Sequence, residues 1–141
     1  MGFFDKVFGK QPEYPELSEE STAAKQLEAV SSDLEQLAKD VKDPLEVIPG
    51  ENGAYVFIGH PPKKFGIAWI EENRVKSFKT LMEEQGLTAQ QVAKLSDALR
   101  EIYLRHQDVE HFQTTIAARD VIITPSKPLE NDVREVLTRL Q

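Results

Sequence analysis

The clearest pattern in the chain is an apolar series with helical spacing. Apolar side chains recur in steps of four, three, four, three and four residues, at Ala23, Leu27, Val30, Leu34, Leu37 and Val41. This spacing places them on one face of a helix, which Ser18 can cap at its start and Asp43-Pro44 ends. We therefore expect one helix over residues 19–42, and we favour its packing on a sheet over a helix–helix dimer seam.

After this helix the pattern changes to short segments rich in β-branched and aromatic residues, which are typical of strands. Three of them follow one another, at residues 45–48, 54–59 and 65–70. Their loops are too short for a parallel crossover, which needs about a dozen residues. The sequence therefore predicts three antiparallel strands with Phe57, Ile67 and Trp69 on buried faces.

The second half of the chain has helical patterns on either side of a short hairpin. Asn73 can begin a helix that Gly86 closes, and Thr88 with Gln91 can form a capping box for the next helix. Residues 108–115 are ambiguous, with weak helical and weak alternating character, whereas 116–118 and 121–124 resemble a hairpin around Arg119-Asp120. Ser126 then opens a final helix.

This order, α-βββ-α(α)-ββ-α, predicts an α+β fold with an antiparallel sheet and helices on one of its faces. We expect residues 18–141 to form a single α+β domain, because 141 residues suit one compact unit. Residues 1–17 contain Pro12 and Pro15 and predict a flexible N-terminal arm and linker. The arm has an apolar cluster at helical spacing, consisting of Phe3, Phe4, Val7 and Phe8. This cluster can touch a membrane interface or a partner groove, and we favour docking on the same or a neighbouring subunit.

The composition narrows the class of protein. The chain has no cysteine, which excludes disulfides, cysteine nucleophiles and cysteine-ligated zinc. No apolar run approaches the roughly 20 residues that span a bilayer, and the first ten residues do not resemble a secretory signal peptide. We expect a cytoplasmic protein without stable membrane anchoring.

The net charge of −7 is unevenly distributed. Residues 11–53 have three basic and eleven acidic side chains, whereas residues 54–82 have five basic and two acidic ones. The basic segment includes His60, Lys63, Lys64, Arg74 and Lys76. We expect these residues to complement the acidic segment within one fold or across a dimer, with an anion site as the alternative. Since the whole chain repels phosphate, we expect no nucleic-acid binding.

The candidate chemistry is sparse. His106 and His111 flank Asp108 and Glu110, but spacing of i,i+5 does not bring two imidazoles to one ion on a helix or a strand. The chain has no nucleophile motif and no phosphate-binding glycine loop. Residues 86–93 resemble the first helix of a helix-turn-helix, although the apolar stripe continues in phase as one helix. We therefore expect no catalytic residues, no metal and no cofactor.

The element order, small size and acidity resemble those of the acidic, dimeric chaperones of bacterial type III secretion. The resemblance implies a bacterial α+β protein that binds other proteins. We expect a non-enzymatic interaction or assembly domain that self-associates and whose protein partner is unknown. The alternatives are a small-molecule or anion-binding regulatory domain, and an enzyme with a dispersed carboxylate and histidine site.

Overall fold

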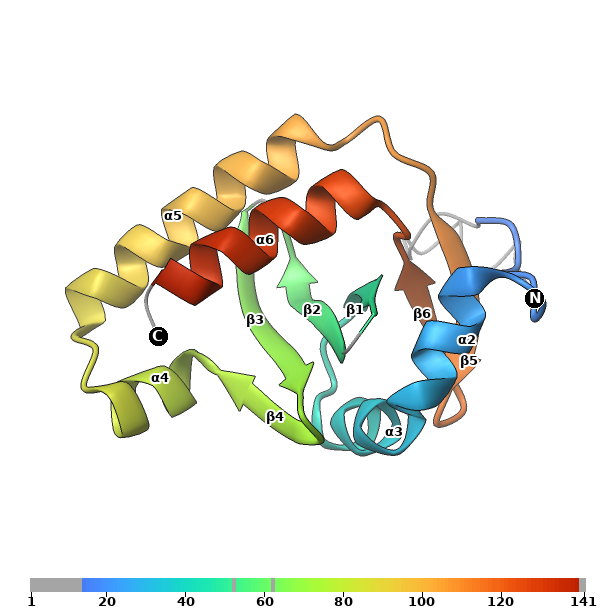
Figure 1. The fold of residues 1–141 in the computed structure, drawn as a ribbon, viewed down its shortest axis with the longest axis horizontal. Helices are drawn as coiled ribbons and strands as arrows, with labels where there is room; N and C mark the ends of the chain where they lie inside the picture. The colour runs from blue at the N-terminus through green and yellow to red at the C-terminus, as the bar shows by residue number, and fades with distance from the viewer. Residues whose placement is uncertain (1–13, 52, 62, 140–141) are drawn as a thin grey trace.

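The computed structural model describes residues 14–51, 53–61 and 63–139 and has an α+β fold, as the sequence predicted (Figure 1). Its elements follow the order α-α-ββββ-α-α-ββ-α. The helices are α2 (Thr22–Ala29), α3 (Ser31–Asp40), α4 (Phe78–Gln85), α5 (Ala89–Arg105) and α6 (Lys127–Arg139). The strands are β1 (Leu45–Gly50), β2 (Gly53–His60), β3 (Lys64–Glu71), β4 (Arg74–Ser77), β5 (Phe112–Ile116) and β6 (Arg119–Ile123).

The sheet is mixed, which corrects the expectation that all its strands are antiparallel. Within the described residues the strand order is β4-β3-β2-β1-β6-β5. Strands β1 to β4 form successive antiparallel hairpins, as do β5 and β6. However, β6 pairs with β1 in parallel, with Glu46 opposite Ile122. The long connection from β1 to β6, which passes through β2 to β4, α4, α5 and β5, makes this parallel pairing possible.

Helices cover both faces of the sheet, so the expectation of helices on one face was wrong. Figure 1 shows α5 and α6 side by side on one side of the sheet, with α2 and α3 on the other. Side chains alternate accordingly along β1, where Val47 packs with the α2–α3 cluster and Ile48 with the α4–α6 cluster. Phe57 and Trp69 lie in the α4–α6 cluster and are 0% and 1% exposed. Apolar residues in consecutive positions of these strands are therefore buried on both sides.

The predicted helix over residues 19–42 is two helices. Val30 has φ −119° and ψ 20°, outside helical values, and separates α2 from α3. The cap of α2 is Ser21 instead of Ser18, since the Ser21 hydroxyl accepts from the Ala24 amide. On the two sides of this break, Leu27 and Leu34 are both buried in one cluster with side chains of the sheet.

Strand β4 replaces the predicted start of a helix after Asn73. Glu72 and Asn73 both have positive φ, 51° and 61°, which is typical of a two-residue hairpin turn. Asn73 therefore turns the chain back along β3, and Ser77 caps α4 instead. A second hairpin turns at Ala117 and Ala118, also with positive φ, two residues before the predicted turn.

Other local signals were correct. Gly86 ends α4 in the left-handed conformation with φ 70°, and Thr88 with Gln91 forms the capping box of α5. Helix α5 is continuous from Ala89 to Arg105, which agrees with one unbroken helix in place of a helix-turn-helix. No helix among the described residues has the length and apolar character needed to cross a membrane.

Residues 14–17, within the expected linker, lie along the edge of the sheet. The Leu17 amide donates to the Gln113 carbonyl, and the Gln113 amide donates to the Pro15 carbonyl, both at 2.9 Å. Glu16 forms a parallel bridge with Gln113 of β5. This part of the expected linker is therefore hydrogen-bonded to the sheet.

Candidate functional site

An apolar groove lies between helices α2 and α3 and the edge strand β5. Its volume is about 220 Å³. Its apolar lining consists of Leu17, Ala24, Leu27, Leu34, Ile116 and Ala117. Leu27 and Leu34 belong to the core and are 7% and 2% exposed. The groove, which we call the α2–β5 groove, therefore reaches from the surface down to core side chains.

The charged residues of the α2–β5 groove all have the same sign. Glu19, Glu28 and Glu35 line it and are exposed, whereas its described lining contains no lysine, arginine or histidine. Neither Glu28 nor Glu35 forms a salt bridge with another described residue. An apolar cleft with an acidic rim favours an apolar segment that also has basic side chains.

The outer edge of β5 adds hydrogen-bonding groups to the α2–β5 groove. Gln113 directs its amide and carbonyl outward, where Pro15 and Leu17 bind them. Hydrogen-bonding direction alternates along a strand, so the amide and carbonyl of Thr115 also face outward. Thr115 is exposed and lines the groove. The groove can therefore bind both the side chains and the backbone of an extended segment.

The basic residues singled out in the sequence do not form one patch. His60 and Lys64 lie at the β2–β3 turn, where they are opposite each other in the strand register. Arg74 follows the turn at the opposite end of β3. Lys63 also lies at the β2–β3 turn, and its carbonyl accepts a hydrogen bond of 3.3 Å from Arg100. The length of β3 separates the basic residues at the β2–β3 turn from those on β4. The basic segment therefore presents no single surface to the acidic segment.

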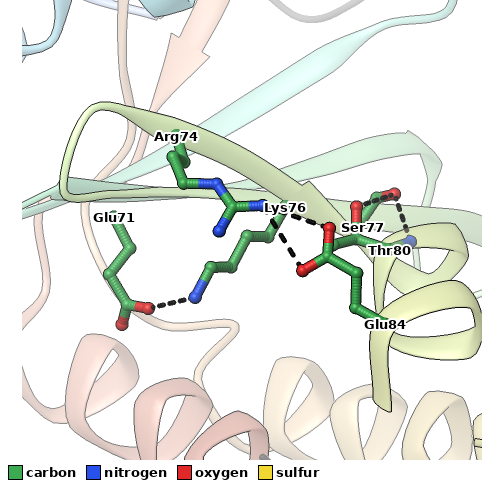
Figure 2. Close-up of polar contacts among 6 residues, drawn as sticks. All are labelled: Glu71, Arg74, Lys76, Ser77, Thr80 and Glu84. Atoms are coloured by element: carbon green, nitrogen blue, oxygen red, sulfur yellow. Dashed lines mark hydrogen bonds and ion pairs between the residues drawn. The ribbon is translucent and has the colours of Figure 1, made fainter. Parts of the chain in front are cut away.

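Two of these basic residues are paired with carboxylates, as Figure 2 shows. Arg74 binds Glu84 at 3.1 Å, and Lys76 binds Glu71 at 2.8 Å. Arg74 and Lys76 both lie on β4, the outermost described strand at this edge, on either side of Val75. Charged side chains on an edge strand oppose pairing with another sheet. Arg74 and Lys76 thus protect this edge more readily than they bind a free anion.

A second pocket, of about 510 Å³, lies at the β2–β3 turn beside the start of α4. His60, Lys64 and Lys79 line it together with Asp43. This pocket brings Lys79 to two of the predicted basic residues, which the sequence alone did not indicate. Its basic side chains suit a small anion.

A polar cluster involving a histidine joins β1, β6 and α5. The Glu46 carboxylate is buried and accepts hydrogen bonds from Tyr103 Oη at 2.7 Å and Thr124 Oγ1 at 2.6 Å. His111 Nδ1 lies 2.9 Å from Thr124 Oγ1, and the ring of Tyr14 lies 5.1 Å from that of His111. Burial, followed by the Glu46 charge, raises the pKa of Tyr103 well above its ordinary value. The hydroxyl therefore stays protonated and donates to the carboxylate.

The two histidines of residues 106–111 come together at one small pocket. His106 and His111 line a space of about 180 Å³ beside Glu46, and His106 Nε2 lies 2.7 Å from Asp132 Oδ2. Asp108 and Glu110 are not among its lining residues. Within the described part of the chain, no group of three or more histidine or acidic side chains is arranged to hold a metal ion. The hydroxyls of Tyr103 and Thr124 already bind both oxygens of Glu46. This arrangement is suited to joining α5 and the end of β6 to β1.

Sequence reasoning missed the α2–β5 groove, because its walls come from segments about 80 residues apart. One signal was present: the pair Leu-Glu occurs at 27–28 and again at 34–35. Each pair places a buried leucine beside an exposed glutamate. The predicted arm residues Phe3, Phe4, Val7 and Phe8 lie outside the described residues.

Comparisons with protein-family models, curated proteins and solved structures find no match to this chain. The resemblance to type III secretion chaperones therefore rests on element order, size and acidity alone.

Proposed function

We propose that this chain is a cytoplasmic, non-enzymatic protein-interaction or assembly domain whose docking surface is the α2–β5 groove. The observation that carries the proposal is the combination of apolar lining and acidic rim in one cleft at a sheet edge. Buried leucines at the base supply apolar contact area, and Glu19, Glu28 and Glu35 supply charge selectivity. Grooves of this kind bind extended or helical segments of other proteins.

A pull-down with a matched pair of variants tests this proposal. Glu28→Lys with Glu35→Lys reverses the rim, whereas Glu83→Lys with Glu101→Lys makes the same charge change on exposed positions of α4 and α5. At physiological salt, we expect the native chain and the α4–α5 variant to retain the same protein partner, and the rim variant to lose it. Mass spectrometry identifies the retained protein, a second copy included. Equal retention by all three proteins, or by none, would contradict the proposal.

The pocket at the β2–β3 turn supports a second candidate function, the binding of a small anion by a regulatory domain. Three basic side chains, His60, Lys64 and Lys79, line this pocket with a single acidic one. Calorimetric titration with inorganic phosphate tests it on the native chain and on Lys64→Gln with Lys79→Gln. Saturable binding that the double substitution removes supports this function, and identical titrations of the two proteins exclude it.

A further inference from the structure

We propose that the α2–β5 groove binds residues 1–10 of a second copy of this chain, so that two copies exchange their N-terminal segments. This inference rests on the proposed function, since it names the occupant of the same groove. It goes further by requiring a homodimer in which each copy supplies one segment and one groove.

The chemistry of residues 1–10 matches the groove. The segment has four large apolar side chains, at Phe3, Phe4, Val7 and Phe8, and two lysines against one aspartate. The groove has the opposite rim charge and an apolar lining that includes Leu27 and Leu34. Insertion of phenylalanine side chains would bury apolar surface, and the lysines would face the glutamates.

The direction of the chain favours a second copy over the same one. Tyr14 lies beside His111, before the start of β5, and residues 14–17 run parallel to β5. The chain thus passes Tyr14 on its way toward the groove, whose β5 side is formed by residues 114–117. The described chain thus begins at the end of β5 opposite its own groove, which favours the groove of a second copy as the docking place of the preceding segment.

The edge of β5 offers backbone groups to the incoming segment. The amide and carbonyl of Thr115 face outward beside the groove. Thr115 is two residues after Gln113, whose amide and carbonyl bind Pro15 and Leu17. A segment lying along this edge can add to the sheet as a short strand. When the exchange is reciprocal between two copies, it closes with two-fold symmetry and the assembly is a dimer.

Sedimentation equilibrium of the full chain and its variants tests the inference. One variant replaces Phe3, Phe4, Val7 and Phe8 with serine, and the other carries Glu28→Lys with Glu35→Lys. We expect the native chain to dimerise and each variant to dimerise at least tenfold more weakly. The matched control, Glu83→Lys with Glu101→Lys, should remain within about twofold of the native chain. Circular dichroism and urea unfolding of each variant establish that it is folded.

Mixing the two defective variants gives the sharpest result. The serine variant retains the groove and the rim variant retains the N-terminal segment, so one native contact can form between them. We expect the mixture to associate more tightly than either variant alone. A native chain that is monomeric at about 100 μM, a serine variant that dimerises like the native chain, or a mixture with no added association would each overturn the inference.

These outcomes are distinguishable from failure of the proposed function. If the chain is monomeric but the pull-down retains a different protein through the groove, the exchange is wrong and the interaction function stands. If the pull-down finds no protein whose retention depends on the rim, the proposed function fails as well.

Discussion

Thr124 donates a hydrogen bond of 2.6 Å from its hydroxyl to the buried carboxylate of Glu46, which joins the end of β6 to β1. The Thr124 amide also donates to the Val47 carbonyl at 2.8 Å. These contacts lie beside the parallel strand pair, the point at which the two antiparallel parts of the sheet meet. Glu46 and Thr124 are 6% and 0% exposed, so this junction depends on hydrogen bonds between protein groups.

Substitution of Thr124 by valine tests this junction. Valine keeps a similar shape but leaves Glu46 Oε2 without its hydroxyl donor, and a buried group that loses its partner costs about 1–3 kcal/mol. We expect the free energy of unfolding, measured with urea, to fall by that amount. Thr138→Val is the control, because Thr138 is exposed on α6; its effect should stay below about 0.5 kcal/mol. Equal effects would show that Thr124 does not support the carboxylate.

Leu34→Ala tests the placement of the apolar series. Leu34 is 2% exposed and belongs to the cluster between α2, α3 and the sheet. Truncation of a buried leucine leaves a cavity, and we expect a loss of about 2–5 kcal/mol in unfolding free energy. The matched control is Leu104→Ala, because Leu104 is 49% exposed on α5. A loss below about 0.5 kcal/mol for Leu34→Ala would place the series outside the core.

Arg119 anchors the end of α3 to the start of β6. Its guanidinium donates to the carbonyls of Ala38, Val41 and Asp43, with distances of 3.0 Å to Ala38 and 2.7 Å to Asp43. Lysine cannot reproduce this planar set of donors. We expect Arg119→Lys to lower the unfolding free energy by about 1–3 kcal/mol and to increase amide exchange at the end of α3. Unchanged exchange there would contradict the anchoring role.

Stability should decrease at alkaline pH. Burial raises the pKa of Tyr55 to about 12, with a lesser lowering effect from Arg134. The unfolded chain ionises near pH 10 while the folded chain remains protonated, so unfolding becomes more favourable as pH rises between these values. We expect the urea concentration at the midpoint of unfolding to decrease as the pH rises from about 10 to about 12. Tyr55→Phe should make this decrease with pH less steep. A flat profile over this interval would exclude the effect.

Metal content should not depend on the two histidines of residues 106–111. One ring nitrogen of each already faces an oxygen partner, Asp132 for His106 and Thr124 for His111. We expect elemental analysis to find no stoichiometric zinc or nickel in the native chain, in His106→Ala or in His111→Ala. Stoichiometric metal that either substitution removes would overturn this prediction.

Local signals in the sequence identified most elements, because caps, turns and apolar spacing act over a few neighbouring residues. The capping box at Thr88 and the left-handed Gly86 depend on contacts within one turn of helix. The break at Val30 and the hairpin at Asn73 were not predicted, since the local pattern favoured a helix at both. In the second case, pairing of β4 with β3 favoured the strand over the helix.

The order of residues alone was enough to establish the α+β class and the identity of the main core residues, because burial of apolar side chains follows a periodicity that is visible along the chain. Tertiary structure decided how the two antiparallel parts of the sheet join, which helices cover each face, and where a cleft remains. The residues involved lie far apart in sequence: Glu46 accepts a hydrogen bond from Thr124, and Leu27 lines the same groove as Ile116. Such pairings depend on how the packed elements fit in three dimensions, so they become visible only in the folded chain.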